Sequence, residues 1–113
     1  MCNQSILNQV TGKVVEAAKE SLGDKLDKVI LYGSYARGDN NDESDVDIMI
    51  LADISRESCW EERKKINRIA GRLDLEYDVL VSLHVTDCAT FYKYINDMPF
   101  YTNVYREGVT LGA

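Results

Sequence analysis

The chain of 113 residues carries 13 basic and 19 acidic side chains, a formal net charge of −6, and is 45% hydrophobic. These values are typical of one globular domain over residues 1–113 and exclude two domains or a disordered chain. No apolar run approaches the ~20 residues of a membrane span, the start lacks a secretory-signal pattern, and the acidic balance argues against direct nucleic-acid binding. Three widely spaced cysteines, Cys2, Cys59 and Cys88, indicate neither a disulfide framework nor a zinc site, so we expect a reduced, cytoplasmic protein.

The chain begins with a predicted helix. Hydrophobic residues recur every four positions from Ile6 to Leu22, which places them on one helical face. Asn3 or Ser5 can cap the start, and Gly23 can provide a left-handed exit.

Two strands and a polar loop follow. Residues 29–32 are a short run of strand-forming side chains, and residues 45–51 form a second such run. The polar segment 33–44 joins them, and residues 34–37 can form one helical turn at its start.

The second half of the chain predicts three helices and one strand. They are a helix from Ser58 or Ser55 to about Leu73, a strand over residues 77–85, a helix capped by Asp87 or Thr86 that extends to Met98, and a short helix from Pro99 to Gly108. This order of elements predicts an α/β or α+β domain with a small mixed sheet packed with helices.

Asp45 and Asp47 are the first residues with clear chemical potential. Side chains two positions apart on a strand share a face, so these carboxylates start ~6–7 Å apart and can lean together. Mg²⁺ prefers oxygen ligands and keeps positions open for phosphate oxygens, and two such ions can hold the attacking and leaving oxygens of a displacement. The pair therefore predicts a site for one or two Mg²⁺ ions.

The turn at Gly33-Ser34 predicts a phosphate site. Gly33 has no Cβ, so a phosphate can approach the backbone, and Ser34 offers a hydroxyl beside the amides of a helix start. Arg37, one turn further, can contact the phosphate or pair with Asp39 or Asp42 on the surface. Each motif alone is most often structural, and only their joint spacing favours nucleotide or metal binding.

A two-metal site needs a third carboxylate. Asp78 is the best candidate, because it is expected to open the strand over residues 77–85 and to be held rigidly there. Glu76 is the alternative, and Glu43 is a weaker one. His84, inside the same apolar strand, is expected to pack rather than to act as a base.

Gly33-Ser34, ten residues and then Asp45-x-Asp47 resemble the signature of the DNA polymerase beta nucleotidyltransferase superfamily. The short chain and the form G-S-Y-A-R-G resemble its minimal nucleotidyltransferases. The resemblance implies the nucleotidyltransferase fold, with Gly33 and Ser34 holding a nucleotide triphosphate and Asp45 and Asp47 binding metal ions. It maps the third metal-binding carboxylate onto Asp78 less securely, because that position has no fixed spacing.

The resemblance also implies an activity and a partner. It implies an enzyme that uses ATP with Mg²⁺. Minimal nucleotidyltransferases are often encoded beside a HEPN-domain ribonuclease toxin and act as antitoxins, transferring AMP to a tyrosine of that toxin. Two alternatives stay open: a binding subunit that neutralises a partner by contact, and a nucleotidyltransferase for a small molecule such as an aminoglycoside, although such enzymes usually carry an added helical domain.

Overall fold

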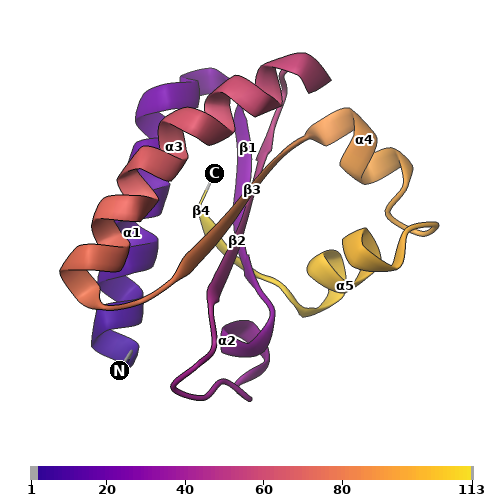
Figure 1. Cartoon of the computed structure of the whole chain (residues 1–113). Coiled ribbons are helices and arrows are strands. Elements are labelled where there is room, and N and C mark those ends of the chain that lie inside the picture. Colours follow the sequence, from indigo (N-terminus) through magenta and orange to yellow (C-terminus); the bar gives the residue numbers. More distant parts are fainter. Residues whose placement is uncertain (1–2, 113) are drawn as a thin grey trace.

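A computed structural model describes residues 3–112, in which four strands form one mixed sheet in the order β3-β2-β1-β4 (Figure 1). The elements in chain order are α1 (Gln4–Leu22), η1 (Gly23–Lys25), β1 (Leu26–Tyr32), α2 (Ser34–Arg37), β2 (Val46–Ala52), α3 (Arg56–Tyr77), β3 (Val81–Asp87), α4 (Cys88–Lys93), α5 (Pro99–Glu107) and β4 (Val109–Gly112). The expected mixed sheet with packed helices is confirmed.

The ends of α1 follow from local chemistry. Asn3 is the N-cap, and its side-chain oxygen accepts a hydrogen bond from the Ile6 amide at 2.9 Å. Gly23 ends the helix with a φ of 53°, a conformation that glycine adopts at low cost. Both features match the prediction from the sequence.

The sheet pairing brings distant segments to one edge. β1 runs antiparallel to β2 and to β4, whereas β2 and β3 are parallel. The end of β1 therefore lies beside the start of β2, where Tyr32 pairs with Asp47, and the start of β3 lies on the other side of Asp47. The short helix α2 lies at this same end of the sheet (Figure 1).

Helices cover both faces of the sheet. In Figure 1, α1 and α3 lie on one side, and α4 and α5 lie on the other. The first face buries a large apolar cluster that includes Val10, Val14 and Ile66. The second face buries a smaller cluster, which consists of Ile30, Met49, Leu51, Phe91 and Val104.

The start of the third strand was predicted wrongly. Helix α3 begins after Ser55, whose side chain accepts a hydrogen bond from the Ser58 amide at 3.2 Å, and it continues to Tyr77. Asp78 is its C-cap in the left-handed conformation, with a φ of 54°. β3 begins at Val81, so Asp78 lies outside the strand that was expected to hold it.

Other boundaries differ by less. α4 ends at Lys93, so the predicted continuation of this helix to Met98 is wrong, whereas Pro99 begins α5 as expected. β4, the short edge strand after α5, was not predicted. Cys59 and Cys88 are free thiols, and Cys2 lies outside the described residues. Over residues 3–112, no helix combines the length and apolar character that a membrane crossing requires.

Candidate active site

Gly33 brings the backbone of the β1–α2 turn against the Asp47 carboxylate. The pairing of Tyr32 with Asp47 sets these segments side by side, and Gly33 adopts a φ of 76° and a ψ of −154°. A Cβ built on Gly33 would collide with Oδ2 of Asp47. The missing side chain thus leaves room for a carboxylate, whereas the approach of a phosphate to this turn stays a prediction from the sequence.

Asp47 is a half-buried carboxylate whose surroundings disfavour its ionised form. Burial raises its pKa, the neighbouring Asp45 raises it further, and Arg37 lowers it. The ionised form therefore gains from any cation bound at the pair. β2 begins at Val46, one residue later than the sequence predicted. Asp45 therefore lies immediately before the strand.

The carboxylates present fit a metal ion that arrives with a nucleotide. Among residues 3–112, no three His, Cys, Asp or Glu side chains are grouped so that they could hold a metal ion alone. Mg²⁺ is commonly bound by one or two carboxylates with substrate phosphates and water completing its shell. Asp45 and Asp47 supply that carboxylate pair, and the backbone of the Gly33 turn lies directly against the Asp47 carboxylate.

Ser34 and Arg37 lie on α2, directly after the turn. Ser34 is partly buried at the first position of the helix. The guanidinium of Arg37 pairs with Asp39 at 3.2 Å and with Glu107 at 3.4 Å, and these contacts raise the pKa of Arg37. The Asp39 contact is the surface pairing that the sequence left open as the alternative to a phosphate contact, and exposed ion pairs of this kind contribute little net energy.

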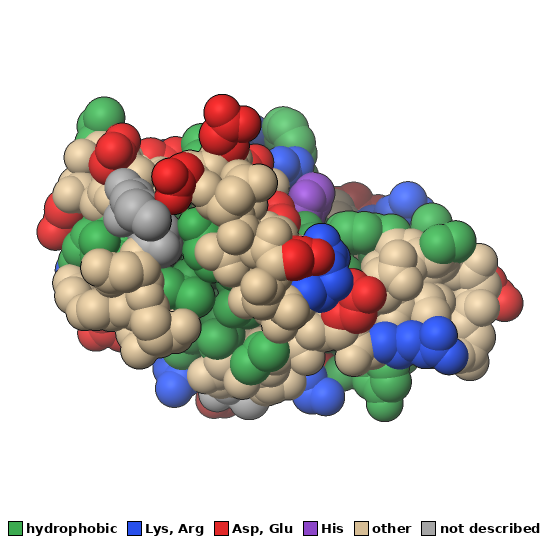
Figure 2. Space-filling model, turned by 90° about the horizontal axis from the view of Figure 1, so that it is seen from below, with side chains coloured by type: hydrophobic (Ala, Val, Ile, Leu, Met, Phe, Trp, Pro, Cys, Tyr) green, Lys and Arg blue, Asp and Glu red, His purple; other side chains and the backbone are tan. Residues whose placement is uncertain are grey.

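Charge is locally mixed at this end of the molecule. Figure 2, which views the end where α2 lies, shows acidic and basic side chains side by side near the centre and hydrophobic side chains among them. Arg37 lies close enough to lower the pKa of Asp47. A cationic guanidinium thus lies close to the Asp45 and Asp47 carboxylates.

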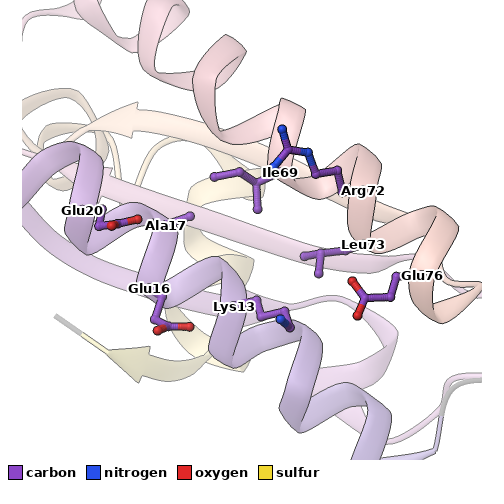
Figure 3. A pocket seen from close by; sticks show the side chains of 8 residues that line it. All are labelled: Lys13, Glu16, Ala17, Glu20, Ile69, Arg72, Leu73 and Glu76. Carbon is purple, nitrogen blue, oxygen red and sulfur yellow. The ribbon is translucent and has the colours of Figure 1, made fainter.

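The structure separates the two candidates for the third carboxylate. Asp78 and Asp45 line one hollow of about 180 Å³, together with Asp42 and Glu43. Glu76 lies on α3 and points into a different hollow, between α1 and α3 (Figure 3). Asp78 therefore lies near Asp45 although it is a helix cap rather than a strand residue, and Asp47 is not among the residues that line this hollow.

Sequence reasoning missed an aromatic cluster beside the aspartates. The rings of Tyr32 and Phe100 lie 5.6 Å apart, and His84 lies 5.8 Å from Phe100 and 6.5 Å from Tyr32. Burial, and then Asp47, raise the pKa of Tyr32 to about 12, so its phenol stays protonated at neutral pH. The sequence indicated this cluster only through Tyr32, the last residue of the strand before the Gly33-Ser34 turn. A residue in that position lies next to the turn.

His84 packs in this cluster, as expected. Burial, and then the Arg63 cation, lower its pKa. The Nε atom of Arg63 is buried and has no hydrogen-bond partner among the described residues. The neutral imidazole is therefore the favoured form on this face of the sheet.

The sequence profile of the nucleotidyltransferase domain family matches residues 12–100, a segment that contains the Gly33 turn and all three proposed carboxylates. The chain belongs to this family. The expected resemblance is thus confirmed, and the protein is a nucleotidyltransferase.

Two relatives of this nucleotidyltransferase come from Methanocaldococcus jannaschii, and both are named as candidate protein adenylyltransferases. MJ0604 is 36% identical over 97 residues, which span 86% of this chain and 89% of the relative. MJ0141 is 54% identical over 61 residues, which span 54% of this chain and 60% of the relative, or less than two thirds of its length.

Solved structures share the fold of this nucleotidyltransferase. A candidate nucleotidyltransferase from Sulfolobus solfataricus matches with a TM-score of 0.61 at 19% identity, covering 96% of this chain and 87% of that one. A toxin–antitoxin structure with AMP-PNP matches with a TM-score of 0.51 at 23% identity, covering 88% and 72%. A complex of a tri-AMPylated HEPN toxin from Shewanella oneidensis with its MNT antitoxin matches with a TM-score of 0.50 at 20% identity, covering 94% and 73%.

Proposed function

We propose that this nucleotidyltransferase transfers AMP from ATP, with Mg²⁺, to a tyrosine hydroxyl of a HEPN-type toxin and so acts as its antitoxin. The close approach of the Gly33 backbone to the Asp47 carboxylate carries the proposal, because it joins a phosphate-binding turn to a cation-binding pair. The names of the relatives support adenylyl transfer, and the toxin–antitoxin structures with this fold support the class of partner and ATP as the nucleotide.

Each residue has a defined part in this proposal. The Gly33 turn, the Ser34 hydroxyl and the Arg37 guanidinium bind and orient the triphosphate for in-line attack. Asp45 and Asp47 hold Mg²⁺, which neutralises charge on the phosphates during transfer. The acceptor oxygen bonds to the α-phosphorus as the bond to pyrophosphate breaks, and Asp78, beside Asp45, receives the phenol proton.

The proposal is tested by intact-mass analysis of the partner. The purified chain is mixed with a HEPN-type toxin from the same organism, together with ATP and Mg²⁺. We expect the partner to gain the mass of one or more adenylyl groups. Asp47→Asn should slow this transfer by about 10³-fold or more, because it removes charge from a metal site worth several kcal/mol.

Asp53→Asn is the matched control, because it removes an exposed carboxylate just after the other end of β2. It should transfer AMP at the rate of the unsubstituted protein. Asp47→Asn should fold at least as stably as that protein, because the raised pKa of Asp47 means that its ionised form destabilises the ligand-free fold. Neutralisation of the toxin without any gain in its mass would contradict adenylyl transfer and indicate inhibition by contact.

A further inference from the structure

A small hollow of about 200 Å³ lies on the α5 side of the Gly33 turn. Val104, which is 1% exposed, closes its inner part. Tyr32 and Phe100 line it with aromatic rings, and Asn103 adds an amide. Because Gly33 borders this hollow and also abuts Asp47, a nucleotide with its phosphates on the turn can reach the hollow with its other end.

Phe100 gives the hollow an available aromatic surface. Its side chain remains 42% exposed although its ring lies at 79° to that of Tyr32 and at 66° to that of His84. These edge contacts hold the Phe100 ring in place from two sides without covering it. A held, exposed ring is the surface on which a nucleobase stacks.

Asn103 supplies matching polar groups. It is exposed on α5, and its side-chain amide makes no hydrogen bond to any other residue in the described part of the chain. A carboxamide presents one donor and one acceptor side by side, which pair with the amino group and ring nitrogen of adenine. Val104 and Phe100 provide apolar area, and Asn103 provides the hydrogen bonds, the usual combination in a small-molecule pocket.

An exposed ion pair joins two of the residues that line the hollow. Arg37 on α2 and Glu107 on α5 both line it, and their side chains lie 3.4 Å apart. This contact ties the phosphate-binding turn to the helix that carries Phe100 and Asn103. The phosphate site and the aromatic site are thus parts of one continuous surface.

We infer that this hollow binds the adenine base of the nucleotide, with Phe100 stacking on the base and Asn103 reading its hydrogen-bonding edge. The inference rests on the proposed use of ATP and names the residues that set its base. Neither residue is needed to hold the phosphates, so their contribution is separable from that of Gly33, Asp45 and Asp47.

Calorimetric titration in Mg²⁺ with AMP-PNP and with inorganic tripolyphosphate tests the inference. The unsubstituted protein should bind both. Phe100→Ala and Asn103→Leu should each weaken AMP-PNP binding, the first by about tenfold or more, and leave tripolyphosphate binding unchanged. Tyr105→Ala is the matched control, because it removes a 60% exposed aromatic ring from α5 outside the hollow, and it should bind both ligands normally.

The outcomes distinguish base binding in the hollow from the proposed function. AMP-PNP binding by Phe100→Ala and Asn103→Leu with the affinity of the unsubstituted protein would overturn the inference and leave the proposed function standing. Equal weakening of both ligands would also overturn it, because these residues would then act through the phosphate site. Failure of the unsubstituted protein to bind either ligand would reject the proposed function itself. Asn103→Leu keeps the test valid if Phe100→Ala fails to fold, since Asn103 is a surface residue.

Discussion

Position 33 requires glycine for two reasons, its backbone conformation and the space that Asp47 occupies, and substitutions can distinguish the two. Its backbone lies in a region open essentially to glycine alone, and its missing Cβ makes room for Asp47. Gly38, the C-cap of α2, also has a positive φ, of 84°, but a Cβ there would meet nothing within 4 Å. The pair therefore distinguishes backbone strain from displacement of the carboxylate.

We predict that Gly38→Ala destabilises the fold by about 1–2 kcal/mol, the cost of an L-residue in the left-handed helical conformation, and that Gly33→Ala destabilises it more, because its backbone conformation is open essentially to glycine alone and its methyl group meets Asp47. Only Gly33→Ala should lose AMP transfer, because its methyl group displaces Asp47 from the turn. Thermal unfolding and the transfer assay, run on both variants, check the two effects. Transfer by Gly33→Ala at the rate of Gly38→Ala would show that the Gly33–Asp47 contact has no role in activity.

At the scale of elements, the end of α3 decides which carboxylate lies beside Asp45. The helix stops at Asp78, and the amide of Val81 then donates a hydrogen bond to the Asp74 side chain at 3.0 Å. This connection leads the chain directly into β3. It leaves Asp78 beside Asp45, whereas Glu76 stays within the helix and faces α1 (Figure 3).

We predict that Asp78→Asn lowers AMP transfer by at least tenfold and leaves stability nearly unchanged, because asparagine tolerates the left-handed cap conformation. Glu76→Gln should change the rate by less than tenfold, under ~1.4 kcal/mol of barrier. Both variants are compared in one Mg²⁺-dependent transfer assay. The reverse order of effects would assign the third carboxylate to Glu76 despite its position.

The sequence predicted most elements, because their ends carry strong local signals such as Asn3, Ser55 and Pro99. The sequence also singled out the Gly33-Ser34 turn and the Asp45-x-Asp47 motif. The contact between Gly33 and Asp47, however, depends on the pairing of β1 with β2. The prediction failed at the end of α3 because Val79 and Leu80 extend the apolar pattern of β3 backwards. Leu80 is in fact 56% exposed, and a left-handed cap at a residue other than glycine leaves no trace in hydrophobic periodicity.

The strand β4 and the aromatic cluster could not be predicted from the sequence, for a different reason. β4 has only four residues, two of them exposed, and it exists because β1 offers a free edge. Phe100 meets Tyr32 and His84 only after three separate segments have packed. Such features arise from tertiary contacts, which single-sequence patterns do not contain.

At the scale of the whole molecule, acid stability should depend on His84. Burial and Arg63 lower the pKa of His84 below its ordinary value of about 6.5, so the fold favours the neutral ring. Its contribution to the free energy of unfolding is present above pH ~6.5 and is lost as the pH falls through the folded-state pKa. Asp47, whose pKa is raised, acts in the opposite direction at lower pH.

We predict that His84→Gln flattens the fall in stability between about pH 7 and pH 5, because the variant has no group there that resists protonation. Denaturant unfolding at a series of pH values, with and without the substitution, gives the difference curve. The contribution of Asp47 is common to both proteins and cancels in this difference. Parallel stability curves for the two proteins would show that the folded protein does not shift the His84 titration.

The unequal sizes of the two apolar clusters give the two faces of the sheet different local stabilities. α4 and α5 contribute one side chain each, Phe91 and Val104, to a buried cluster of five, whereas α1 and α3 share the much larger cluster on the opposite face. Segments with few buried contacts open at a lower free energy than the whole domain, and their amide hydrogens exchange sooner. α5, which carries Phe100 and Asn103, can therefore detach transiently while β2 keeps its hydrogen bonds. Under the proposed function, this opening gives the product nucleotide an exit that does not require β2 to unfold.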